Sequence, residues 1–219
     1  MMTHSINSIG RRGVLGLSVA VFAAAAPWYP ASAQSADDAS PTAPVQQLGG
    51  ALLAAMKAGD HTPFAERYRA LAPAIEQVFN LEAVLAASVG LSWATLPAAQ
   101  QAELVTAFRR YTVSSYVANF NSYNGQSFEV LPATRAVGNG EVVAQSRLLR
   151  TDGSPIVLDY VMRRFPAGWQ AVDVLTDGSI SRVAVQRSDF RGLLAGGGVP
   201  ALAAGLEHKV ASLSGGMIG

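Results

Sequence analysis

The sequence predicts an α+β domain, in which helices at both ends of the chain pack against an antiparallel β-sheet. Apolar residues recur at helical spacing before Gly125, alternate with polar residues from there to Asp177, and then return to helical spacing. The chain has 219 residues, of which half are hydrophobic and none is cysteine. This is enough for one domain whose core needs no disulfide.

The first 33 residues have the pattern of a cleaved signal peptide. Two arginines open the stretch "RRGVLGLSVAVFAAAA", and a small-x-small tripeptide follows, ending at Ala33. The apolar part is shorter than the roughly 20 residues that span a bilayer, so we expect secretion with cleavage between Ala33 and Gln34. The paired arginines leave open whether export uses the general secretory or the twin-arginine route.

Residues 34–44 are polar, contain proline and lack periodicity, which is typical of a disordered leader. A single domain is therefore expected over residues 45–219. Cleavage removes two of the 16 basic residues, which leaves 14 against 15 acidic residues. A nearly neutral chain is not expected to bind nucleic acid, because that affinity comes mostly from cations that neutralise phosphates.

Helices are expected throughout the first part of the domain. Apolar spacing predicts a helix over 45–59. Thr62 as N-cap with Pro63 at the first helical position predicts a second helix, which should break before Pro73 and resume to Phe79.

Asn80 should cap a short third helix that ends at Gly90, and the longest periodic segment then predicts a helix over 98–122. Arg109, Arg110 and Ser114 lie mostly off its apolar face. That face carries Leu104, Phe108, Tyr111, Tyr116, Phe120 and Tyr123.

Past Gly125 the period of two predicts a meander of four strands, or slightly more, separated by short glycine-containing turns. The strands are expected over 127–135, 141–150, 155–165 and 169–177. The third strand points Asp159 and Arg163 to one face. Its apolar face carries Ile156, Leu158, Tyr160 and Met162.

The segment after the sheet fits two structures. Ile180, Val183 and Val185 fit a strand, whereas Val183, Phe190 and Leu194 fit a helix, which is the structure that we expect. A glycine hinge at 196–198 should precede a last helix that begins at Pro200.

Residues for common catalytic chemistry are missing from the sequence. Beyond the signal peptide the histidines are His61 and His208, both expected at the surface, and no nucleophile-elbow, zinc-protease or P-loop motif occurs. Asp159 and Asp173 could form an acid pair, but surface ion pairs with nearby arginines are expected instead. The sequence therefore predicts no enzyme, no cofactor and no metal site.

The order of the segments resembles a known family. The stretches "FAERYRALAPAIEQVFNLEAVLAASVGLSWATLPAAQQ", "LDYVMRR" and "GWQAVDVLTDGSISRVAVQRSDFRGLLAGGG" are similar to the MlaC, or toluene-tolerance, family of periplasmic lipid carriers. Within it, "VANFNSYNGQSFEVLP" most resembles the hopanoid-associated HpnM branch. The likeness covers about residues 45–212. Its markers are spread over Trp93, Tyr116, Tyr123, Tyr160, Trp169, Asp173, Gly178 and Phe190.

The resemblance implies a sheet curled against helices around an apolar pocket that holds lipid tails, with no cofactor. It also implies a periplasmic carrier that exchanges a phospholipid or a hopanoid with an inner-membrane ABC lipid transporter and outer-membrane components. An exported adaptor with a filled core and no ligand is the alternative. Because the polar positions lie off the apolar faces, tail volume is expected to set specificity more than the head group.

The candidate site residues follow from these patterns and this resemblance. The aromatic face is either packed core or cavity wall. Arg109, Arg110, Arg163 and Arg164 are candidate phosphate or partner contacts, unless they are solvated surface residues. The expected pocket lining is Val89, Trp93, Phe108, Tyr111, Tyr116, Phe120, Val142, Leu158, Tyr160, Met162, Val172 and Val174.

Overall fold

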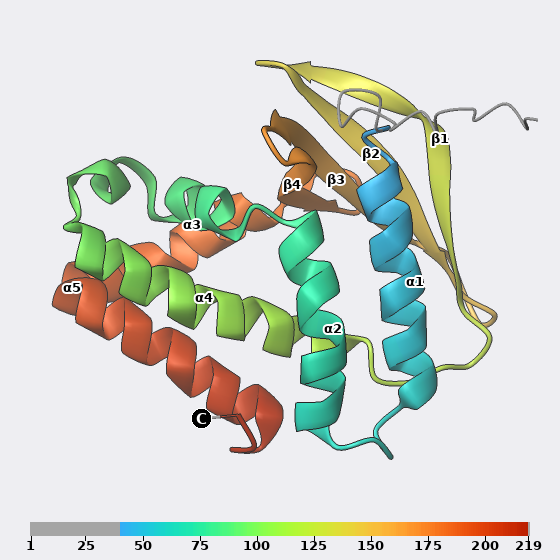
Figure 1. Ribbon diagram of the computed structural model, residues 1–219, viewed down its shortest axis with the longest axis horizontal. Coiled ribbons are helices and arrows are strands. Elements are labelled where there is room, and N and C mark those ends of the chain that lie inside the picture. The colour runs from blue at the N-terminus through green and yellow to red at the C-terminus, as the bar shows by residue number, and fades with distance from the viewer. Residues whose placement is uncertain (1–39, 219) are drawn as a thin grey trace, which may run out of the picture. The chain divides into compact units, whose positions relative to one another are not determined.

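A computed structural model describes residues 40–218, and the predicted signal peptide with most of the leader lies outside them (Figure 1). The described elements follow the predicted α+β order. They are α1 (Ala43–Ala58), α2 (Phe64–Val78), α3 (Leu81–Val89), the 3₁₀ helix η2 (Gly90–Thr95), α4 (Ala98–Asn119), β1 (Ser127–Gly138), β2 (Glu141–Leu149), β3 (Ile156–Phe165), β4 (Gly168–Thr176), β5 (Ile180–Ser181) and α5 (Arg182–Ser214).

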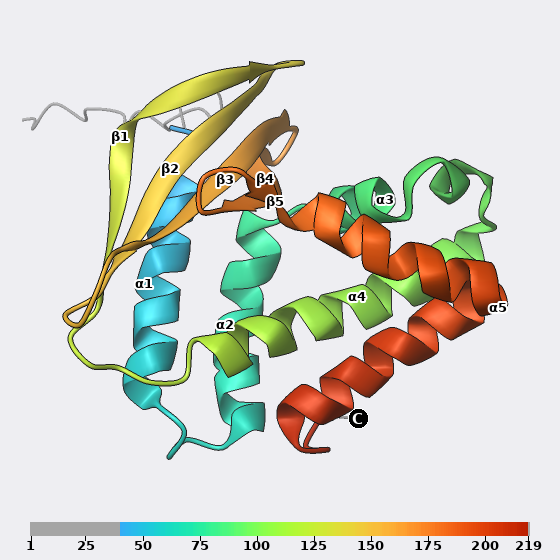
Figure 2. The ribbon, with the colours of Figure 1, turned by 180° about the vertical axis from the view of Figure 1, so that it is seen from behind.

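The five strands form one antiparallel sheet in the order β1-β2-β3-β4-β5, so the predicted meander gains one two-residue strand. Tyr160 pairs with Ala144 on β2 and with Val174 on β4, which keeps the apolar side chains on the face toward the helices. Figures 1 and 2 show the sheet curling over α1, with α2 and α4 next to it. The core lies between this face and the helices.

α1 begins at Ala43, so the last two residues of the predicted leader belong to a helix. α2 corrects two further expectations. It runs unbroken through Pro73, which is exposed, so the carbonyl that loses its helical N–H partner can bond to water instead. Pro63, not Thr62, is the N-cap residue, because the Thr62 hydroxyl donates back to the Ala58 carbonyl oxygen at 3.0 Å.

α3 begins as predicted, with the Asn80 side-chain oxygen accepting a hydrogen bond from the Ala83 N–H at 2.9 Å. α4 ends at Asn119, earlier than expected, so Phe120 and Tyr123 follow the helix instead of extending its apolar face. Ser114 is fully buried rather than lying off the packed side. The reason is that α2, α3 and α5 all pack on α4.

The segment after β4 combines the two structures that its sequence fits. Ile180 pairs in β5, and α5 then begins with Ser181 as N-cap, its hydroxyl accepting from the Ala184 N–H at 2.9 Å. The glycine hinge is also present, because Gly197 and Gly198 leave helical geometry inside α5. Beyond this kink the helix returns along α4, as Figure 2 shows.

Asp159 does not form the expected surface ion pair. It is only 3% exposed, and its carboxylate accepts a hydrogen bond from the backbone N–H of Ser146 at 3.2 Å. The turn after β4 folds back over it, with a Cβ at Gly178 reaching within 3.6 Å of its Oδ2 atom. Within residues 40–218, no helix is long and apolar enough to cross a bilayer.

Candidate functional site

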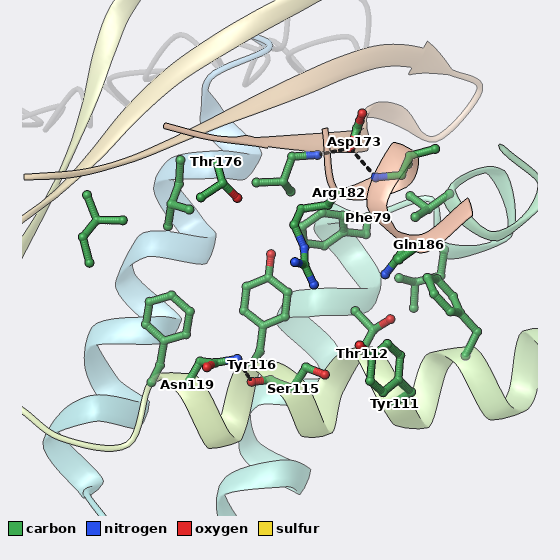
Figure 3. Close-up of a pocket in the computed structure, with 18 of the residues that line it drawn as sticks. Phe79, Tyr111, Thr112, Ser115, Tyr116, Asn119, Asp173, Thr176, Arg182 and Gln186 are labelled. Atoms are coloured by element: carbon green, nitrogen blue, oxygen red, sulfur yellow. Dashed lines mark hydrogen bonds between the residues drawn. The ribbon is translucent and has the colours of Figure 1, made fainter. Parts of the chain in front are cut away.

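A cavity of about 450 Å³ lies between α4, the apolar face of β3 and β4, and the start of α5 (Figure 3). Phe79 and α3 supply further wall. Half of the twelve predicted pocket residues line it, namely Phe108, Tyr111, Tyr116, Phe120, Leu158 and Val174. The volume falls within the range of about 300–1,000 Å³ that is usual for small-molecule sites.

The aromatic residues form a continuous wall along this cavity. Phe120 stacks on Tyr116 with ring centroids 5.8 Å apart, and Tyr116 lies 5.7 Å from Phe79. The row extends to Phe128 at one end and to Tyr160 at the other. The aromatic stretch of α4 is therefore both core and cavity wall, because the same helix face continues from close packing into the cavity.

Two tyrosine hydroxyls pair behind this wall. Burial raises the pKa of Tyr116 well above 10, and the nearby Tyr160 raises it further, in part because Tyr116 donates a hydrogen bond to it. Arg182 opposes this rise in the pKa of Tyr116. Burial also raises the pKa of Tyr160, although accepting that hydrogen bond partly offsets the rise. Both phenols are thus neutral near pH 7.

The other six predicted pocket residues lie elsewhere. Val89 and Trp93 line a second hollow between α3, η2 and α5. Tyr160 and Met162 are close-packed in the core, and Val142 packs against the core partly buried. Val172 occupies the extra position of a bulge in β4, where the register shifts between Val161 and Met162, so it leaves the alternation that would have pointed it inward.

None of the four predicted arginines lines the cavity. Arg109 forms an ion pair with Glu76, Arg110 with Glu207, and Arg163 with Glu141. Arg164 lies over the Trp169 ring, 5.8 Å from its centroid. The three ion-paired side chains therefore have acidic partners on the outer surface, which agrees with the solvated interpretation.

The cavity also has polar residues that sequence reasoning missed. Thr112, Ser115 and Asn119 share one face of α4 with Tyr116, and Arg182 and Gln186 follow one another at helical spacing on α5. The helical spacing of Thr112, Ser115 and Asn119 relative to Tyr116 could have identified these three polar residues from the sequence. No local pattern indicates the α5 pair, because its position depends on how α5 docks against α4.

Asp173 lines the cavity as well, but its carboxylate holds the start of α5 and forms no ion pair with a described residue. Its Oδ1 atom accepts from the N–H groups of Val174 at 2.7 Å and Val183 at 3.0 Å (Figure 3). Its Oδ2 atom accepts from the Ser181 hydroxyl. The expected ion pair at Asp173 is therefore wrong, because the carboxylate caps a helix instead. The two histidines are exposed, as expected.

Comparison with known proteins adds a family and a fold. The family model described as "MlaC protein" matches residues 46–208. A search of curated proteins gave no significant match. Among solved structures, this chain is similar to the phospholipid-binding protein from Ralstonia solanacearum, whose structure contains a phospholipid. The TM-score is 0.69 at 20% identity, over 80% of this chain and 99% of the other.

Proposed function

Because this chain belongs to the MlaC family, we propose that it is a periplasmic lipid carrier without enzymatic activity. Its cavity shields the apolar tails of a phospholipid or a hopanoid during transfer. The observation that carries the proposal is the aromatic-walled cavity between α4 and the sheet. The phospholipid in the Ralstonia solanacearum structure of the same fold supports it.

Elementary energetics explains what such a cavity contributes. Moving a two-chain lipid with roughly 30 methylenes into water costs on the order of 24 kcal/mol of free energy, at about 0.8 kcal/mol per methylene. Moving the tails from a bilayer into an apolar cavity removes most of this cost. A two-chain lipid is larger than a drug-sized ligand, so we expect α4 and the sheet to move apart when it binds.

The proposal also covers the export of the protein, its branch of the family and its transport partners. Export by the signal peptide, cleavage after Ala33, and membership of the hopanoid-associated HpnM branch belong to it. So does lipid exchange with an inner-membrane ABC transporter and with outer-membrane components. The branch resemblance favours a hopanoid as cargo, whereas the phospholipid in the solved structure of the same fold favours a phospholipid.

The direct test is mass spectrometry of lipids extracted from the purified protein, together with Leu158→Arg. Leu158 is partly buried on the cavity wall, so the new charge can extend into the cavity and stay hydrated. We expect about one lipid per wild-type chain. The variant should remain folded, with a cooperative thermal transition, and carry at least about tenfold less lipid.

Leu91→Arg is the matched control, because Leu91 is 99% exposed on η2 and does not line this cavity. It should carry as much lipid as the wild type. An empty wild-type protein would support the adaptor without a ligand. Loss of soluble folded protein in Leu158→Arg alone would mean that Leu158 is packed core.

A further inference from the structure

We propose that Arg182, with Gln186 and Thr112, binds the phosphate group of the carried lipid where the cavity opens to solvent. This inference rests on the proposed carrier function and specifies its ligand class. Arg182 and Asn119 are the exposed members of the cavity lining, so water reaches the cavity beside them. A head group placed there stays hydrated while its tails run inward along the aromatic wall.

Arg182 lacks the acidic or carbonyl partners that most arginines of the described domain have. Arg135 and Arg191 lack them too, but of these three only Arg182 lines the cavity beside α4. Arg109, Arg110 and Arg163 each pair with a glutamate, and Arg187 donates to the Ala87 carbonyl oxygen. Within residues 40–218, the Arg182 guanidinium makes no such ion pair or hydrogen bond, although Asp173 also lines the cavity. The Asp173 carboxylate is committed to Val174, Val183 and Ser181 at the start of α5.

The position of Arg182 is also locally unfavourable. It is the first residue of α5, where the helix dipole favours an anion and disfavours a cation. An anionic ligand in the cavity would offset this unfavourable position of the Arg182 guanidinium. Guanidinium donors match two phosphate oxygens at once.

The neighbouring polar groups are donors too. The Gln186 side-chain oxygen lies 3.1 Å from the Ser88 hydroxyl, whose one proton it shares with the Val84 carbonyl oxygen at 2.8 Å, so the Gln186 amide nitrogen is left for the cavity. The Thr112 Oγ1 atom is buried and has no hydrogen-bond partner in the described chain. Figure 3 shows Arg182, Gln186 and Thr112 pointing into the same part of the cavity. The Ser114 Oγ atom is unpartnered in the same way but lies outside the cavity lining, so of these two hydroxyls only Thr112 is placed to meet a ligand acceptor.

This donor cluster changes the expected specificity. The apolar faces alone favour selection by tail volume, whereas unpaired donors in the lining penalise a lipid that lacks an acceptor-rich head group. The carrier should therefore prefer a phosphate-bearing lipid to a neutral lipid with the same tails. By the same reasoning it should prefer a phospholipid to a hopanoid with an uncharged head group.

The test is competition for the protein expressed from its full sequence and purified. Vesicles offer phosphatidylglycerol and diacylglycerol with identical acyl chains, and mass spectrometry counts the lipid bound. Wild type should take up phosphatidylglycerol at least about tenfold better, which corresponds to about 1.4 kcal/mol. Arg182→Gln should reduce this preference to about twofold or less, because the loss falls on phosphatidylglycerol uptake.

Two further variants keep the test sharp. Arg182→Lys keeps the charge but removes the paired donors, so its preference should be intermediate, and it replaces Arg182→Gln if that variant does not fold. Arg109→Gln removes an arginine outside the cavity and should leave the preference unchanged.

Equal uptake of the two lipids by wild type would overturn the phosphate site and leave the carrier function intact. A preference that survives in both Arg182 variants would overturn the role of Arg182. Uptake of neither lipid would overturn the carrier function and this site with it. Inorganic phosphate is the last arm: if it raises the thermal transition of wild type but not of Arg182→Gln, without any lipid preference, the site binds free phosphate instead.

Discussion

The cavity beside the sheet and the second hollow beside α3 are lined by different residues. The cavity measures about 450 Å³, and its wall continues the aromatic core. The hollow is larger, about 950 Å³, but α3, η2 and α5 form its sides, with Leu91 almost fully exposed. Volume alone therefore does not identify the site. Val89 is the core residue that the hollow shares, whereas the wall of the smaller space includes Phe79, Phe108 and Val174 of the core cluster.

The first half of α5 separates these two spaces and contributes to both. Arg182 and Gln186 belong to the cavity, whereas Arg187, Arg191 and Leu194 belong to the hollow. Residues four apart share a helix face, so one helix presents a donor cluster to one side and a solvated surface to the other. The two faces of α5 therefore supply different side chains to the cavity and to the hollow.

The largest expected effect contrasts one aromatic residue from each space. Phe108 is buried against Phe190 with ring centroids 6.3 Å apart, so Phe108→Ala should lower the free energy of unfolding by roughly 3–5 kcal/mol. Trp93 on the hollow is partly exposed, so Trp93→Ala should cost about 1 kcal/mol or less. Denaturant titration measures both. Equal losses would mean that the hollow is also part of the core.

A smaller effect tests the kink that ends the shared half of α5. Gly198 has φ +66° and ψ −152°, a conformation essentially confined to glycine, so Gly198→Ala should destabilise the fold by roughly 1–3 kcal/mol. Gly196 is helical and a Cβ there meets nothing within 4 Å, so Gly196→Ala should stabilise it by about 0.4–1 kcal/mol. Thermal unfolding should show opposite signs, and the same sign for both would argue against a required kink.

The smallest effect concerns Tyr116, which lines the cavity, and Tyr160, which lies in the core behind it. The pKa values of Tyr116 and Tyr160 are raised in the folded state, so the unfolded chain loses these protons first. Their stabilisation is fully present below about pH 10, the unfolded pKa, and is lost as the pH rises toward the folded pKa.

Each of the two tyrosines should thus remove up to about 1.4 kcal/mol of unfolding free energy per pH unit above pH 10. Unfolding in urea at pH 9 and pH 11 measures this slope. A Tyr116→Phe/Tyr160→Phe double variant should have a shallower slope, whereas Trp93→Ala should keep the wild-type slope. An unchanged slope in the double variant would show that these phenols are not protected.

Much of the fold was predictable because it depends on local chemistry. The period of two predicted the meander, Asn80 predicted the N-cap of α3, and the glycines at 196–198 predicted the kink in α5. Pro73 was misjudged, since whether a proline breaks a helix depends on which side faces water. Val172 was misjudged because a bulge shifts side-chain alternation without changing composition.

The sequence by itself determined that this chain folds as an α+β domain, and it identified the aromatic face of α4 that lines the cavity. Only the tertiary structure decided that Arg182 enters the cavity while Arg109 and Arg163 pair with glutamates outside it. The physical reason is the distance along the chain over which the determining interactions act. Helical and strand periods repeat within a few residues, whereas the position of Arg182 depends on α5 docking against α4, which lies far earlier in the chain.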